Sequence, residues 1–319
     1  MSQPFESPRP ATIRSKLMLE AVSEMVSQRG YPYSQAKVSL RPQGPGPWAF
    51  ALIGSDAPEA IDQVAKREVD VAIINPSTVL NIAYLGKGPY KESIPVRTIG
   101  VIPSRDWFGF AVKESTGLTS VGDIGRKHFP LRVSLREQRD HSVHLVLEQV
   151  LQAHGFSLSD ITEWGGQVSY DPGLPADPAR IGRAESGEVD AIFDEAVSRF
   201  IPPAVKLGMR FLPIDKEAAP KLVDIGLRPD MLPKSKFPML PADVQTVDFS
   251  GFAVFAHAET PESFVYDFTR ALDVRKDRIP TQYPGPLPVE TMCKDTAEGP
   301  LGVPLHPGAE RYWREAGYI

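Results

Sequence analysis

The chain has 319 residues, of which 42% are hydrophobic and 24% are charged, and its formal net charge is -5. These values are typical of a globular protein. They argue against a nucleic-acid-binding surface, because the basic residues are scattered rather than gathered into a run. The single cysteine, Cys293, excludes an internal disulfide and a cysteine-rich zinc site. No apolar run reaches the roughly 18 residues that cross a membrane, so no membrane span is expected.

The N-terminal residues do not have the basic segment and apolar stretch of a signal peptide. As written, the sequence predicts a cytoplasmic protein, and a periplasmic one only if a leader precedes this chain. Residues 1–12 are rich in proline and predict an extended arm. A helix is expected over 13–28, with Leu17, Ala21 and Met25 on one face.

The next part of the chain predicts a helix followed by a buried strand. A short alternating strand is expected over 37–41, and the proline- and glycine-rich residues 42–47 cannot be helical. A helix begins near Pro58, and the apolar run 69–74 predicts a strand buried on both faces.

The same plan returns later in the chain. Glu188-Val189-Asp190 and the strand after it repeat the arrangement of Glu68-Val69-Asp70 and its strand, each after a helix end. Two separated copies of a helix-to-strand unit indicate two similar α/β lobes.

Alternating helices and strands occupy the rest of the chain and predict an α/β fold with mostly parallel sheets flanked by helices. Strands are expected over 96–103, 108–113, 131–135 and 246–256, helices over 142–154, 261–272 and 309–315, and a loop over 280–288.

Three segments resemble one known family. The run Pro-Leu-His-Pro-Gly-Ala at 304–309 leads into a helix with Tyr312, as in the closing motif of TAXI receptors, the solute-binding proteins of TRAP transporters. The segments 121–124 and 246–272 resemble the family's connector and its return strand and helix. The resemblance implies a periplasmic-binding-protein type II fold with ligand held between two lobes and TRAP membrane subunits as partners.

The resemblance also implies two hinge crossings, which we place near Arg105 and Asp248. Lobe one is then 1–105 with 249–319, and lobe two is 106–248. The chain departs from the family where a Gly-Ser-Gly-like turn normally grips a carboxylate through bare backbone N–H groups. Here that turn is the charged segment 136–142.

Ligands of parallel α/β sheets bind beyond the carboxyl ends of the strands, and this rule selects four loops. In the first, Arg136 or Arg139 would grip a carboxylate beside the free N–H groups of the following helix, with Ser142 at its start. The ligand-binding candidates of the other loops are Asn75, Ser77 and Thr78 in the second, Arg105 and Trp107 in the third, and Asp194 in the fourth, which also contains Glu195.

Each loop also has a purely structural interpretation. The first loop would be a solvated, charged loop, and the second would only cap a helix. Arg105 would pair with Asp106 at the surface while Trp107 packs on the core, and Asp194 would belong to a solvated helix start. A metal pair of His141 with His144 lacks a matching third ligand, so we expect no metal.

The leading hypothesis is a solute-binding protein that closes on a small carboxylate and needs no cofactor. The alternative is a cytoplasmic enzyme on the same fold, a lyase or decarboxylase acting on a carboxylate substrate. In that enzyme His141 or Glu195 would be the acid or base, and Arg136 and Arg139 would orient the substrate. The sequence has no phosphate-binding glycine loop, nucleophile elbow or zinc-protease motif, which disfavours the commonest other activities.

Overall fold

The computed structural model describes residues 10–27, 35–42, 49–279 and 286–319, and the chain divides into two units, 1–36 and 37–319. The first unit holds α1 (Pro10–Ser27), whose apolar side chains Leu17, Met18 and Met25 are exposed. The expected extended arm is wrong for residues 10–12, since the helix begins at Pro10. Proline suits a first helical position because it has no N–H to leave unpaired there. The expected end of this helix, residue 28, lies outside the described residues.

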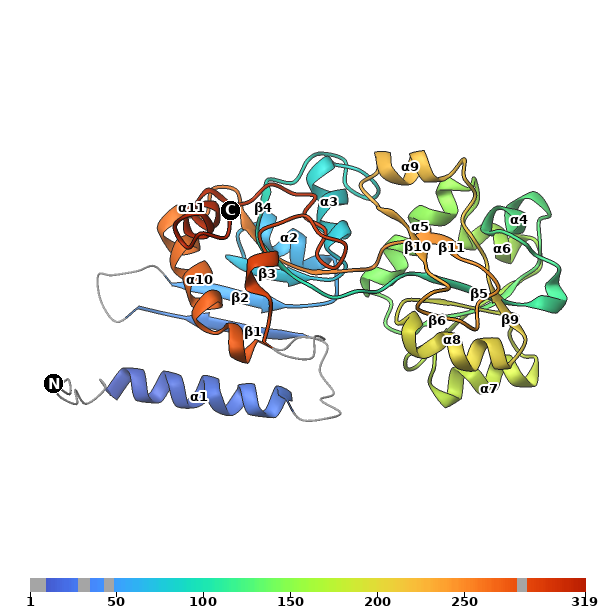
Figure 1. Ribbon diagram of the computed structural model, residues 1–319, viewed down its shortest axis with the longest axis horizontal. Coiled ribbons are helices and arrows are strands. Elements are labelled where there is room, and N and C mark those ends of the chain that lie inside the picture. The colour runs from blue at the N-terminus through green and yellow to red at the C-terminus, as the bar shows by residue number, and fades with distance from the viewer. Residues whose placement is uncertain (1–9, 28–34, 43–48, 280–285) are drawn as a thin grey trace. The chain divides into compact units, whose positions relative to one another are not determined.

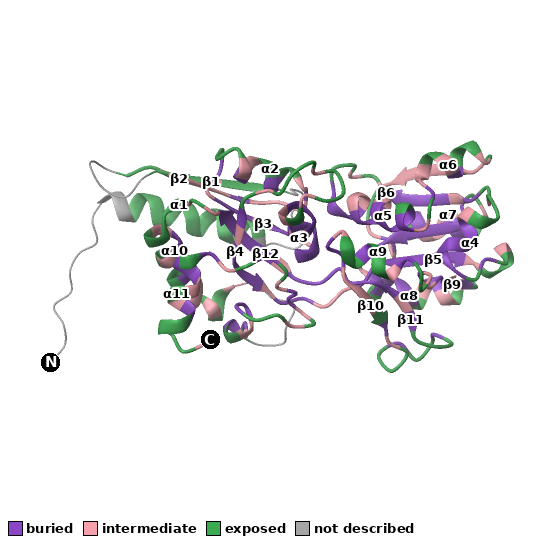
Figure 2. Ribbon diagram, turned by 90° about the horizontal axis from the view of Figure 1, so that it is seen from above, coloured by how far each residue is buried: buried purple, intermediate pink, exposed green. Residues whose placement is uncertain are grey.

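The first sheet of the second unit has the strand order β1-β2-β3-β12-β4. Figure 1 labels β1 to β4, and Figure 2 labels β12 as well. β2 and β3 run parallel, and β12 is antiparallel to both β3 and β4. β2 was not expected from the sequence, although it is a short apolar run. The bounds are β1 (Ala36–Leu40), β2 (Phe50–Gly54), β3 (Val71–Ile74), β4 (Val96–Ile102) and β12 (Phe252–His257).

The second sheet has the strand order β7-β6-β8-β5-β9. β6 runs parallel to β7 and β8, and β5 is antiparallel to its neighbours β8 and β9. In the first sheet β2, β3 and β4 therefore share one direction and β12 opposes them. In the second sheet β6, β7, β8 and β9 share one direction and β5 opposes them. The bounds are β5 (Gly109–Lys113), β6 (Arg132–Arg136), β7 (Gln167–Asp171), β8 (Ala191–Asp194) and β9 (Met209–Phe211).

Helices flank both sheets, and Figure 2 shows the central strands β3, β12 and β5 buried between them. With the first sheet go α2 (Glu59–Ala65), α3 (Ser77–Leu85), α10 (Glu262–Val274) and α11 (Pro307–Glu315). With the second go α4 (Val121–Arg126), α5 (Ser142–Ala153), α6 (Leu158–Glu163), α7 (Pro178–Ser186), α8 (Val197–Lys206) and α9 (Ala219–Asp224). Short 3₁₀ turns lie at Glu114–Thr116, Lys276–Arg278 and Val289–Thr291.

The sequence repeat is also a structural repeat. α2 leads into β3 and α7 into β8, and each strand is the third in its sheet, beside the opposed strand. The aspartate of each copy binds the neighbouring parallel strand: Asp70 Oδ2 accepts from the N–H of Ala51 at 2.8 Å, and Asp190 Oδ2 from that of Arg132 at 3.4 Å. The two halves are thus built on one plan.

The chain crosses between the sheets twice. The first crossing, 103–108, runs from β4 to β5, and the second, 248–251, runs from β11 (Val244–Val247) to β12. β11 pairs with β10 (Pro229–Leu232) and not with either large sheet, so the single strand expected over 246–256 is wrong. Gly251 adopts a left-handed φ of 78°. This conformation interrupts the extended backbone of residues 246–256, although most residues of that segment have a high strand propensity. The lobe boundaries at 105 and 248 stay a prediction.

The fit of Gly251 provides a stability test. A Cβ at this position would lie 2.7 Å from Val101 Cγ1, in a conformation that disfavours L side chains. We expect Gly251→Ala to lower the free energy of unfolding by about 2–4 kcal/mol, measured by denaturant titration. Gly117→Ala is the control, because its φ is 66° but nothing lies within 4 Å of a Cβ there. It should cost only about 1 kcal/mol. Equal losses in both variants would refute the packing argument.

Candidate ligand-binding site

Loops at the carboxyl ends of strands from both sheets meet in space. Asp56, which follows β2, accepts hydrogen bonds at its backbone oxygen from the N–H and the hydroxyl of Ser142, at the start of α5. Asp106 in the first crossing accepts from the N–H of Ala196, just beyond β8. The rule that chose the candidate loops therefore brings together residues of both halves.

A buried carboxylate lies at the centre of these loops. Asp194 has no exposed surface and lies between two arginines. Arg136 Nη2 donates to its Oδ1 at 2.7 Å, and Arg180 Nη1 donates to its Oδ2. Arg180 is itself fully buried and also donates to Ser134 Oγ at 3.1 Å. Such a carboxylate is stable only because two opposite charges and hydrogen bonds compensate its lost hydration.

Arg136 connects this ion pair to two further groups. Its Nη2 also donates to Glu195 Oε1, and its Nη1 lies 3.0 Å from His141 Nε2. We call Asp106, Arg136, His141, Arg180, Asp194 and Glu195 the Arg136 cluster. Nε and Nη2 of the Arg136 guanidinium donate to carboxylates of the chain itself. Nη1 faces His141 Nε2, which carries the ring hydrogen and does not accept, because His141 Nδ1 is the acceptor of the neutral ring.

Glu195 and Asp106 form a pair of hydrogen-bonded carboxyl groups. Burial raises the pKa of Glu195 to about 8, with the Arg136 charge opposing the shift and the Asp106 charge adding to it. Burial raises the pKa of Asp106 too, but its carboxylate accepts N–H groups of Trp107, Ala196 and Val197. These three donors favour the charged form of Asp106, so Glu195 carries the shared proton at neutral pH.

His141 is held as a neutral ring. Burial, followed by the neighbouring Arg136 charge, lowers its pKa to about 3. Its Nδ1 accepts the N–H of Val143 at 3.0 Å and so caps α5. A ring with this pKa is a weak base at neutral pH, and its Nδ1 lone pair is already used.

The start of α5 does not offer the free N–H groups that the sequence suggested. The N–H of Ser142 donates to Asp56 O at 3.0 Å, that of Val143 to His141, and that of His144 to His141 O at 3.1 Å. Asp56 from the first half thus takes the place expected for an anion. Its side chain also accepts from Gln138 at 2.8 Å.

Other predicted residues lie around this region. Arg139 is exposed, and its guanidinium lies 3.4 Å from the ring centroid of Tyr170. Asn75 Nδ2 donates to Gly251 O at 3.0 Å, and Ser77 Oγ donates to Ser250 O at 3.3 Å. These two side chains therefore bind the second crossing.

Arg105 anchors both crossings. Its guanidinium donates to Asp230 at 2.5 Å, to Asp248 at 3.0 Å and to Ala297 O at 2.9 Å, and it lies 4.5 Å from the Trp107 ring centroid. The alternative of a surface pair with Asp106 is wrong, because the carboxyl group of Asp106 binds Glu195 and α8 instead. Trp107 is only 2% exposed.

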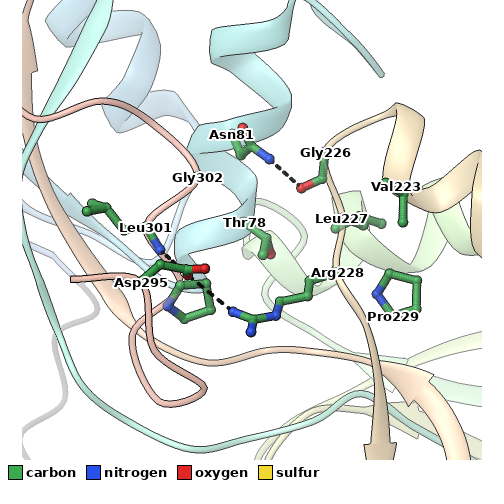
Figure 3. A pocket seen from close by; sticks show the side chains of 11 residues that line it. Thr78, Asn81, Val223, Gly226, Leu227, Arg228, Pro229, Asp295, Leu301 and Gly302 are labelled. Atoms are coloured by element: carbon green, nitrogen blue, oxygen red, sulfur yellow. Dashed lines mark hydrogen bonds and ion pairs between the residues drawn. The ribbon is translucent and has the colours of Figure 1, made fainter.

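A pocket of about 350 Å³ opens between α3, the segment before β10 and residues 295–302 (Figure 3). Its polar lining comprises Thr78, Asn81, Arg228 and Asp295. We call it the Thr78 pocket. A larger pocket of about 660 Å³, lined by residues of β9 and 239–244, includes none of the predicted site residues.

Sequence reasoning missed three members of this region. Asp56 follows β2, which was not expected as a strand, and Asp106 was assigned to the surface. Arg180 lies four residues before the buried Ala184 on α7, and a charged residue on the buried face of a helix is the signal that would have found it.

Comparison with known proteins identifies the family. Residues 53–317 match the NMT1-like family, and the chain belongs to it. Two sheets flanked by helices and joined by two crossings make the two-lobed periplasmic-binding-protein fold, so the expected fold class is confirmed. Within the described ranges, no helix combines the length and the apolar character needed to span a membrane.

Solved structures with some similarity include binding proteins of several kinds. One is the alkanesulfonate-binding protein SsuA from Xanthomonas axonopodis pv. citri bound to MOPS. Its sequence identity to this chain is 16% and its TM-score is 0.33, and the match covers 70% of this chain and 61% of that one. Another is the glycine betaine/L-proline-binding protein ProX from Borrelia burgdorferi. Its sequence identity is 13% and its TM-score is 0.35, and the match covers 66% of this chain and 65% of that one. The chain thus spans less than two thirds of these two proteins. Because the TM-scores of both matches are below 0.5, these structures do not define the fold of this chain. The fold is instead described from the strand order and the crossings of the chain itself.

The protonation of Glu195 predicts a pH effect on stability. In the unfolded chain its proton dissociates near the ordinary pKa of 4.5, whereas the folded protein keeps it up to about pH 8. Between these values the folded state binds more protons, so its stability falls as pH rises, by up to about 1.4 kcal/mol per pH unit. Glu195→Gln should flatten this part of the profile, measured by urea unfolding from pH 5 to pH 9. Parallel profiles for the two proteins would show that Glu195 is ionised when folded.

Proposed function

We propose that this chain is a solute-binding protein of the TAXI type that holds a small organic acid between its two halves. The observation that carries the proposal is the position of Arg136, at the meeting point of the strand-end loops, with carboxyl groups already bound to its guanidinium. Arginine binds carboxylates through two parallel N–H donors, and this geometry suits a ligand carboxylate equally.

Charge favours an anion at this position. While Glu195 carries its proton, Arg136 and Arg180 share one ionised carboxylate, Asp194. The charge of Asp106 is compensated by N–H groups at the start of α8. A ligand carboxylate that displaces the neutral Glu195 from Arg136 therefore replaces a neutral partner by a charged one, which strengthens the hydrogen bond.

The contacts of Asp56 suggest how the cleft would open and close. Its backbone oxygen and side chain bind Ser142 and Gln138 across the two halves. A second carboxylate oxygen of the ligand would take over the N–H and hydroxyl of Ser142, and the halves would move about the crossings 103–108 and 248–251. The proposed role places the protein in the periplasm, with TRAP membrane subunits as the partners of the closed form.

The enzyme alternative depends on Glu195, because His141 is a weak base here. A carboxyl group with a pKa of about 8 is protonated at neutral pH and has the property of a general acid. Its hydrogen bond to Asp106 instead occupies it in a structural contact. Consumption of a ligand during incubation distinguishes the two roles.

The test combines a screen with paired variants. Small mono- and dicarboxylates are screened by thermal shift, binding is quantified by calorimetry, and each mixture is analysed by mass spectrometry after incubation. Arg136→Gln should weaken binding about 10- to 100-fold, the range for a hydrogen bond to a charged group. Arg132→Gln is the matched control, because Arg132 lies at the opposite end of β6 and pairs with Asp190.

A bound carboxylate that stays intact, with affinity lost only in Arg136→Gln, supports the receptor. Equal affinity in both variants would remove Arg136 from the site. A compound consumed over time would replace the receptor by the enzyme, and Glu195→Gln would then test the proposed acid. Thermal unfolding of each variant alone shows whether it is folded.

A further inference from the structure

The Thr78 pocket shares no residue with the Arg136 cluster and has unused binding groups. Thr78 is the second residue of α3 and is 4% exposed, yet its hydroxyl makes no hydrogen bond within the described chain. A buried hydroxyl without a partner destabilises the folded chain, because it has lost its hydrogen bond to water and gained none in return. Figure 3 shows its side chain within the pocket, between Asp295 and Leu227. The orphan hydroxyl therefore points to a ligand that provides its partner.

Two side chains of opposite charge, Arg228 and Asp295, line the same pocket. Arg228 Nη1 lies 3.4 Å from Asp295 Oδ1 and 3.1 Å from Thr296 O. In the described part of the chain, both hydrogen bonds of this guanidinium use Nη1, which leaves Nε and Nη2. Asp295 Oδ1 also accepts the N–H of Leu301, so Oδ2 is the oxygen left for another donor. The long Arg228–Asp295 contact is a weak one, because both side chains are well exposed, at 42% and 64%.

The remaining walls are apolar. Val223, Leu227, Pro300 and Leu301 line the pocket, and its volume of about 350 Å³ lies in the range of small-molecule sites. An arginine and an aspartate side by side are complementary to a ligand that bears both charges. A ligand with one charge would satisfy one side chain and repel the other.

We propose that the Thr78 pocket is a second ligand site, which binds a small zwitterion with an aliphatic body. The ligand carboxylate takes Nε and Nη2 of Arg228, its ammonium group takes Oδ2 of Asp295, and one of the two bonds the Thr78 hydroxyl. The aliphatic body packs on Leu227 and Leu301.

The pocket wall is fixed by close packing around one amide. Asn81 Nδ2 donates to Gly226 O at 2.9 Å. A Cβ on Gly226 would lie 3.1 Å from this nitrogen, and a Cβ on Gly302 would lie 2.9 Å from Asn81 Cγ. Only glycines fit against both sides of the amide. α3, the segment before β10 and the 295–302 segment therefore meet at a defined spacing.

Occupancy of this pocket also acts on the second crossing. The N–H of Asp248 donates to Arg228 O at 2.8 Å, so the residue that would hold the carboxylate is bonded to the crossing itself. A ligand that bridges α3 and Arg228 stabilises the arrangement in which these segments touch. It would thereby shift the balance between open and closed forms toward the one described here.

The proposal is tested by calorimetry on the full chain with three probes of one shape. The probes are L-leucine, which has both charges, 4-methylpentanoate, which lacks the ammonium group, and 3-methylbutylamine, which lacks the carboxylate. We expect L-leucine to bind at least 10-fold more tightly than either analogue. Equal binding of L-leucine and 4-methylpentanoate, or no heat from L-leucine up to roughly 10 mM, overturns the zwitterion site.

Variants then locate the binding. Arg228→Gln and Asp295→Asn should each weaken L-leucine binding at least 10-fold. Arg270→Gln is the control and should leave binding unchanged, because Arg270 pairs with Asp267 on the exposed face of α10. Thr78→Val should raise the Tm of the unliganded protein, by removing the unpaired hydroxyl, and yet weaken L-leucine binding about 5-fold. A purely structural Thr78 would change only the Tm, and that result would remove it from the site.

Arg136→Gln separates this site from the proposed solute site. It should leave L-leucine binding unchanged while weakening the organic acid found by the carboxylate screen. Loss of L-leucine binding in Arg136→Gln, with normal binding in Arg228→Gln, would place L-leucine in the Arg136 cluster and overturn the second site. Failure of the carboxylate screen alone would leave the L-leucine result standing.

Discussion

The buried charge of Asp194 is the constraint on which the centre of the molecule depends. A carboxylate with no exposed surface requires compensation, and two arginines from different elements supply it: Arg136 at the end of β6 and Arg180 on α7. The ion pairs therefore fix the carboxyl ends of two parallel strands and the helix that covers them. Arg136 therefore ties the start of the charged loop after β6 to the end of β8.

The two sites differ in how far the chain satisfies its own polar groups. In the Arg136 cluster, Nε and Nη2 of Arg136 already donate to Asp194 and Glu195, so a ligand would compete with internal partners for them. The Thr78 pocket has several polar groups that make no hydrogen bond within the described chain. They are the Thr78 hydroxyl, Nε and Nη2 of Arg228, and Oδ2 of Asp295. If these are the two ligand sites we propose, the first would select ligands that are better anions than a neutral Glu195. The second would bind its ligand with little reorganisation.

The sequence predicted the periodic parts of the fold well. The helix expected over 142–154 is α5 (Ser142–Ala153), and the Glu-Val-Asp repeat marks equivalent strands in the two sheets. It failed where strand propensity continues through a change of sheet, as over 246–256, because propensity does not report the partner of a strand. The four loops were chosen by a rule about strand ends. The pairing of Asp106 with Glu195 and the role of Arg180 depend on tertiary contacts between distant residues, which no local pattern contains.

The place of β12 in the first sheet has a consequence for the order of folding during synthesis. β12 lies between β3 and β4, although β4 ends at Ile102 and β12 begins only at Phe252, so β12 leaves the ribosome last of the strands in the described chain. All strands of the second sheet precede it, so that sheet is able to complete its pairing while β3 and β4 still lack their common neighbour. Until His257 has emerged from the ribosome, the edges of β3 and β4 that pair with β12 have no partner strand. Those edges are the surfaces at which a chaperone, or a neighbouring nascent chain, has access to the protein.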